Sequence, residues 1–220
     1  MTRELWVEDL GRRPYAEVLE LQRELAKERI AGTRPDTLLL VEHDPVVTLG
    51  RSSKAAHLLA DATLLAKRGV DLFEIERGGD VTFHGPGQLV GYPIIDLTQH
   101  KRDMHWYLRQ LEQVLIDTLA TFGIQGSRVE KYTGVWVGDR KIASIGVHAR
   151  SWVTWHGFAL NVSTDLSYFD LMVPCGIPDV QMTSIERELR RPVEVSAVAE
   201  IVWDAFAECF DLHVRAPLPK

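Results

Sequence analysis

The sequence predicts an α+β fold, with a mostly antiparallel or mixed sheet and flanking helices. Strand-like runs follow one another across short turns between residues 134 and 163, as in a meander of antiparallel strands. Apolar residues at helical spacing are confined to separate stretches near the N-terminus, between residues 103 and 123, and at the C-terminus. This segregation differs from the alternation of strand and helix that builds a parallel sheet. No repeat or linker interrupts the chain, so we expect residues 1–220 to form a single domain.

The first part of the chain alternates apolar runs with turn residues. A short strand at residues 5–7 precedes a helix that Pro14 opens and Gly32 ends. Strands are expected at residues 37–42 and 46–49, with His43 in the turn between them rather than as a ligand. A short helix over residues 58–67 and a strand over residues 70–75 follow.

The remaining elements are predicted in the same way. Residues 89–97 form a largely buried strand, in which Pro93 requires an edge or a bulge. Asp103 caps a long helix that ends at Gly123. A tight hairpin turns at residues 138–139, and strands follow at 142–149 and 152–162. Residues 167–179 are irregular, and two helices at 184–189 and 195–212 complete the chain.

Composition excludes several classes of protein. The net charge is −6, which argues against a nucleic-acid partner because such binding depends on clustered lysines and arginines. No stretch has the apolar length of a signal peptide or of a membrane span, so we expect a cytoplasmic protein. The two cysteines, Cys175 and Cys209, are too few for a disulfide framework and are expected to be thiols.

A glycine-rich run at residues 77–88 is the most unusual segment. Its polar side chains alternate with glycines, which leave the backbone accessible, as is typical of a loop and strand edge that contact a ligand. The alternative is a pair of tight turns around a short strand at residues 81–84. The run matches neither a Walker loop nor a dinucleotide-binding fingerprint. Its candidate binding residues are Arg77, Gly78, Gly79, Asp80, Val81, Thr82, Phe83 and His84.

Cys175 is the candidate nucleophile. It lies between a proline and a glycine, outside any periodic apolar run, whereas Cys209 lies among apolar residues of the last helix. A loop cysteine reacts only where a neighbouring cation, helix terminus or metal lowers its pKa; otherwise it is an ordinary thiol. Lys141, just after the hairpin turn, is the candidate cation. The alternative interpretation is that Lys141 is an ordinary hairpin lysine exposed to solvent.

The strands after Lys141 carry small residues and two histidines. Ser144, Gly146 and Gly157 suggest a groove in which the backbone approaches a ligand. A zinc site made of His84, His148 and His156 is disfavoured, since their spacing matches no usual ligand pattern.

Four motifs, taken together and in order, resemble the lipoyl(octanoyl) transferase family. They are the glycine-rich run, the segment from Arg140 to Gly146, the segment His156 to Asn161, and Pro174-Cys175-Gly176-Ile177. Phe83 departs from the tyrosine common in that family. The resemblance implies the fold of the biotin and lipoate protein ligase catalytic domains.

The resemblance also implies a function. The family moves an octanoyl group from octanoyl-acyl carrier protein to a lysine of a lipoyl domain. Its acceptors are the lipoyl domains of 2-oxoacid dehydrogenase complexes and the glycine cleavage H protein. Cys175 matches the position that forms the acyl-thioester and Lys141 the lysine that activates it. The predicted binding residues of the acyl and pantetheine tunnel are those of the run 77–84 together with Ser144, Ile145, Gly146, Gly157, Phe158 and Ala159.

Because the donor thioester is already activated, no ATP, metal or other cofactor is expected. An ATP-dependent lipoate or biotin ligase on the same fold is the first alternative. A non-catalytic acyl or lipoyl-domain binding module and a cysteine hydrolase are the others. Acyl carrier proteins are acidic, so docking on a chain of net charge −6 would need a local basic rim. Its candidates are Arg51, Arg77, Arg128, Lys131, Arg140 and Arg150.

Overall fold

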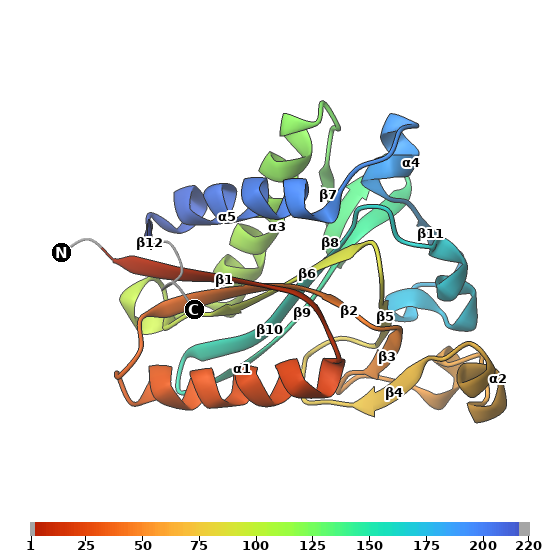
Figure 1. The fold of residues 1–220 in the computed structure, drawn as a ribbon, viewed down its shortest axis with the longest axis horizontal. Helices are drawn as coiled ribbons and strands as arrows, with labels where there is room; N and C mark the ends of the chain where they lie inside the picture. The colour runs from red at the N-terminus through yellow and green to blue at the C-terminus, as the bar shows by residue number, and fades with distance from the viewer. Residues whose placement is uncertain (1–2, 216–220) are drawn as a thin grey trace.

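The computed structural model describes residues 3–215 and is built on one large mixed sheet (Figure 1). The strand order is β12-β1-β2-β6-β10-β9-β8-β7, and β11 pairs with β9. The pairs from β2 to β7 are antiparallel, whereas β1 runs parallel to both β2 and β12, and β11 runs parallel to β9. The strands are β1 Glu4–Arg13, β2 Asp36–His43, β6 Gln88–Ile94, β7 Ser127–Val129, β8 Tyr132–Val137, β9 Arg140–Arg150, β10 Val153–Asn161, β11 Gln181–Met182 and β12 His213–Arg215.

A second, three-stranded sheet lies beside the large one (Figure 1). It consists of β3 Val46–Leu49 between β4 Asp71–Glu74 and β5 Val81–His84. The apolar residues of β3 and β5 pack there against the segment before Cys175. The expected α+β class with a mostly antiparallel, mixed sheet is confirmed.

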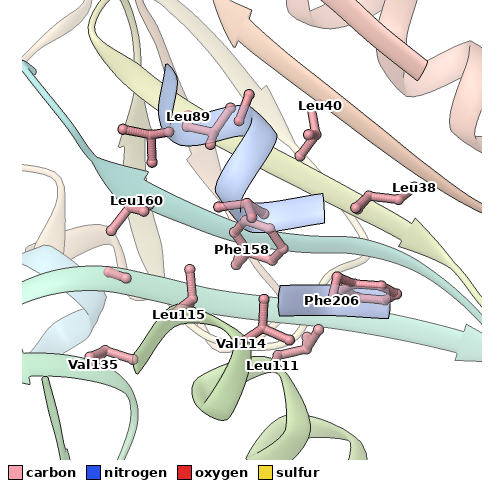
Figure 2. Close-up of a cluster of buried hydrophobic side chains, with 14 of the residues drawn as sticks. Leu38, Leu40, Leu89, Leu111, Val114, Leu115, Val135, Phe158, Leu160 and Phe206 are labelled. Atoms are coloured by element: carbon pink, nitrogen blue, oxygen red, sulfur yellow. The ribbon is translucent and has the colours of Figure 1, made fainter. Parts of the chain in front are cut away.

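Helices cover both faces of the large sheet. α3 (Met104–Thr121) and α5 (Val195–Phe210) pack on one face, and α1 (Tyr15–Ile30) packs on the other (Figure 1). α2 (Ala62–Lys67) and α4 (Ile185–Leu189) are short. Because side chains alternate along a strand, Leu38 and Leu40 of β2 join the core with α3 and α5, whereas Leu39 joins the core with α1. Figure 2 shows the first of these cores, with Phe158 between the two helices and β2.

Several predicted elements differ in extent. The first strand runs to Arg13, because it pairs with β2 along most of its length. The helix expected over residues 58–67 begins only at Ala62, where the Asp61 side chain accepts a hydrogen bond from the Leu64 N–H at 2.8 Å. The expected caps of the long helix are confirmed, with Asp103 accepting from the Trp106 N–H and Gly123 at φ +73° after the helix.

Pro93 does not lie at a sheet edge, which corrects that expectation. β6 pairs with β2 on one side and with β10 on the other, but the ladder with β10 ends at the pair Phe158 and Gly91. Pro93 lies beyond that last pair, so its missing N–H breaks no bond to β10. None of the helices within residues 3–215 combines the length and the apolar character needed to cross a membrane.

Candidate active site

A cavity of about 390 Å³ lies at the large sheet and is lined by residues of both apolar cores, such as Val90 and Phe158, and by Tyr15 of α1. It brings together most of the predicted site residues, which come from the glycine-rich run, β9, β10 and the loop after β10. Those lining it are Arg77, Gly78, Gly79, Asp80, Thr82, His84, Lys141, Ser144, Ile145, Gly146, Gly157, Phe158, Ala159 and Cys175.

Val81 and Phe83 do not line this cavity. They alternate with Thr82 and His84 along β5 and point into the core of the small sheet. The Phe83 ring stacks there on Tyr168 at 4.5 Å between ring centroids. Their contribution is therefore to hold β5 in place.

Small residues in register form the floor of the cavity. In the ladder between β9 and β10, Ser144 pairs with Ala159 and Gly146 pairs with Gly157. A Cβ atom on Gly146 would lie 2.8 Å from the carbonyl oxygen of Gly78, so glycine there lets the glycine-rich loop approach the strand. The N–H of Gly78 donates to the carbonyl of Val147 at 2.8 Å and fixes this approach.

Lys141 and Cys175 meet at this cavity. Lys141 Nζ lies 3.3 Å from Cys175 Sγ, and Ser144 Oγ lies 3.5 Å from the same sulfur. The Lys141 side chain is buried, donates to the Thr133 carbonyl at 3.3 Å and lies over the Trp136 ring at 4.8 Å. Cys175 occupies a short 3₁₀ turn, Pro174–Gly176, in the left-handed region at φ 56°. The left-handed residue indicates backbone strain held by its surroundings.

The environment changes the acidity of this thiol. Burial alone would raise the pKa of Cys175, but the Lys141 ammonium, the Ser144 hydroxyl and the Arg77 guanidinium outweigh it and hold the pKa below its ordinary value. Cys209 is the opposite case, because burial and nearby carboxylates raise its pKa to about 11. Only Cys175 therefore has the electrostatic environment of a nucleophile.

Arg77 is a buried cation and not part of a surface rim. It is 6 % exposed and donates to the Thr48 carbonyl at 2.7 Å and to the Gly78 carbonyl at 3.0 Å. Two other candidates for the rim, Arg128 and Arg140, form salt bridges with Glu112 and Glu188. Lys131 is exposed and lines the cavity. The basic rim is therefore smaller than the sequence suggested.

The predicted histidines do not form a metal site. His84 Nδ1 bonds to Gln88 Oε1 at 2.8 Å, and burial, His43 and Arg77 lower its pKa to about 3, so the ring is neutral. His156 lies 3.8 Å from Glu76, and His148 packs on Trp155. Within residues 3–215, no three histidine, cysteine or carboxylate side chains gather as metal ligands.

Two tyrosines that the sequence reasoning did not single out also line the cavity. Tyr15 comes from α1 and stacks on His84 at 6.2 Å between ring centroids. Tyr92 comes from β6 and bonds His43 Nε2 at 2.8 Å. The sequence does contain a signal for Tyr92. It lies two positions after Val90 in a buried strand, so both side chains point to the same face of the sheet, here the cavity.

Comparison with known families settles the relationship of the chain. Residues 14–207 match the lipoyl protein ligase A/B catalytic domain. The chain belongs to this family. The resemblance inferred from the four motifs is thus confirmed at the level of the family.

Relatives in the lipoyl protein ligase A/B family are about half identical to this chain. An octanoyltransferase of Solibacter usitatus is 52% identical over 205 residues, which cover 93% of this chain and 92% of the relative. An octanoyltransferase of Rubrobacter xylanophilus is 53% identical over 200 residues, 90% of each chain. The resemblance to octanoyltransferases in particular is also confirmed.

Solved structures share the fold at much lower identity. The bipartite lipoate protein ligase of Thermoplasma acidophilum superposes with a TM-score of 0.76 at 18% identity, covering 100% of this chain and 88% of that one. A biotin protein ligase of Aquifex aeolicus gives a TM-score of 0.51 at 12% identity, covering 94% of this chain and 70% of that one. These likenesses confirm the expected ligase-like fold.

Proposed function

We propose that this protein transfers an octanoyl group from octanoyl-acyl carrier protein to a lysine of a lipoyl domain, through an acyl-thioester on Cys175. The observation that carries the proposal is the pair of Lys141 Nζ and Cys175 Sγ, 3.3 Å apart in a cavity floored by small residues. The lowered pKa of Cys175 supports its role as nucleophile. The octanoyltransferases that are about half identical to this chain support the same reaction.

The first half-reaction needs no cofactor. The Cys175 thiolate attacks the carbonyl carbon of the donor thioester, a new C–S bond forms and the donor C–S bond breaks. The departing thiolate of the carrier takes a proton from the Lys141 ammonium. One thioester replaces another, so the step costs little free energy and requires no ATP.

The substrates and the compartment follow from this chemistry. We infer that the acceptors are the lipoyl domains of 2-oxoacid dehydrogenase complexes and the glycine cleavage H protein. Lys131, exposed at the cavity, is a positive charge that an acidic carrier protein can contact. A reactive thiol requires a reducing compartment, which supports a cytoplasmic location.

The competing function is ATP-dependent ligation. The relatives about half identical to this chain are octanoyltransferases, whereas the lipoate ligase of Thermoplasma acidophilum is 18% identical. A ligase also has no need of a nucleophilic cysteine with a lysine partner. Both observations favour the transferase.

Intact-mass measurement tests the proposal. The protein is incubated with octanoyl-acyl carrier protein without ATP, and a lipoyl domain is then added. We expect an octanoyl adduct on Cys175 that moves to the acceptor lysine. An absolute requirement for ATP, or the absence of any adduct, would contradict the transferase.

A further inference from the structure

A histidine and a carboxylate lie directly beside the cysteine turn. His57 Nδ1 is 2.6 Å from Asp80 Oδ2, and the other Asp80 oxygen accepts the N–H of Val81 at 2.8 Å. A Cβ atom on Gly176 would lie 2.5 Å from Asp80 Oδ2 and 3.0 Å from His57 Nδ1. The pair therefore packs against the residue that follows Cys175.

The pair also lies where two cavities meet. Asp80 and Cys175 line the cavity described above, and His57 lines a second, open cavity of about 750 Å³. Ile177, two residues after the cysteine, lines both. Asp170, Asp179 and Arg187 are the other charged residues of the second cavity. The second cavity thus reaches Pro174 and Ile177, the residues that flank the Cys175 and Gly176 pair, from the side of His57.

The proton balance of the second half-reaction leaves one proton that a group of this kind would accept faster than water at neutral pH. After the first half-reaction Lys141 is a neutral amine, because it has given a proton to the departing carrier thiol. The acceptor arrives as an ammonium with three protons. One stays on the nitrogen of the new amide, and one returns to Lys141 as the C–S bond breaks and the Cys175 thiolate forms again. The third proton needs another acceptor.

We propose that His57, held by Asp80, accepts this third proton from the acceptor lysine. A carboxylate can only accept a hydrogen bond, so Nδ1 of His57 carries the hydrogen and Nε2 is the nitrogen that takes the proton. The amine then attacks the thioester carbonyl, the C–N bond forms, and imidazolium later releases its proton to water. Asp80 also attracts the incoming ammonium. This assignment rests on the proposed transferase function.

The other histidines of the cavity suit this role less well. His84 is 7 % exposed, bonded to Gln88 and stacked on Tyr15. His156 is 1 % exposed and lies beside Glu76. His57, whose side chain is 21 % exposed, is accessible to an acceptor protein.

The two half-reactions of His57→Gln, measured separately, test the inference. We expect acylation of Cys175 by octanoyl-acyl carrier protein at the wild-type rate in this variant. Transfer from the isolated acyl-enzyme to a lipoyl domain should fall roughly 10²-fold at pH 7, the usual contribution of a general base. The fall should diminish as the pH rises, because more of the acceptor amine is then already neutral.

Two controls separate a base from a structural residue. Hydroxylamine is neutral at pH 7, so it should discharge the wild-type and variant acyl-enzymes equally. His100→Gln removes a comparable contact, His100 Nε2 to Asp36 Oδ2 at 3.0 Å, from residues that do not line either cavity, and should leave transfer unchanged.

The outcomes are distinct. Undiminished transfer by His57→Gln would overturn the inference, and so would an equal loss of acylation or of the hydroxylamine reaction. A wild-type protein that forms no acyl-enzyme would overturn the transferase function itself.

Discussion

Lys141 Nζ lies 3.3 Å from Cys175 Sγ, although the two residues are 34 positions apart in the chain. The lysine is carried by β9 and the cysteine by a strained turn, so the contact depends on the packing of two separate elements. This relationship explains why only one of the two thiols has a lowered pKa.

Loss of the lysine should move the reactivity of Cys175 to higher pH. In Lys141→Met, burial would still raise the pKa of Cys175, while the main opposing charge would be gone. The midpoint of iodoacetamide alkylation against pH should therefore rise. Lys131→Met removes another lysine of the cavity as a control and should leave the midpoint unchanged. Equal midpoints in wild type and Lys141→Met would contradict the electrostatic account.

Replacing each of the two cysteines should have opposite effects on octanoyl transfer. Cys175→Ala should form no octanoyl adduct and transfer nothing, as judged by intact mass. Cys209→Ala should retain the adduct and the transfer rate, because its thiol has a raised pKa and lies on α5, away from the cavity. Transfer by Cys175→Ala at the wild-type rate would eliminate the covalent route.

A methyl group at Gly157 should push apart two strands beside the cavity. In Gly157→Ala the new Cβ collides with the Gly91 carbonyl oxygen and with Pro93 of β6. Overpacking of this kind typically costs about 1–3 kcal/mol of the free energy of unfolding. Folded Gly157→Ala protein should also acylate slowly. Gly32→Ala is the control: its φ of +73° makes alanine costly, but no atom lies within 4 Å of the new Cβ, so the acylation rate should not change. Normal acylation by Gly157→Ala would show that this displacement of the strands does not reach the cavity.

The sequence predicted the parts of the site that a local pattern marks. Cys175 was evident from its proline and glycine neighbours, and the small residues of β9 and β10 from their composition. His57 was missed because no local pattern marks it, and only the fold brings it to Asp80, 23 positions later. Likewise, turn residues between two strands do not indicate whether both strands join the same sheet. β2 and β3 follow one another in the chain but belong to different sheets. Arg77 was expected both to line the tunnel and to join a basic rim; it lines the cavity, but it bonds to backbone carbonyls and is buried rather than at the rim.

Buried neutral histidines should make the fold sensitive to acid. Burial lowers the pKa of His43 to about 4, so between the ordinary histidine pKa of about 6.5 and pH 4 the unfolded chain binds a proton that the folded chain does not. The free energy of unfolding therefore falls as the pH drops through this window, by about 2 kcal/mol from His43 alone at pH 5. His43→Gln should lose that much less stability than wild type between pH 7.5 and pH 5, measured by urea unfolding. Tyr92→Phe removes the hydrogen bond to His43 but leaves a buried imidazole, so its loss should match that of wild type. An equal loss in His43→Gln and wild type would show that His43 is already protonated in the folded protein, or that the proton is taken up elsewhere.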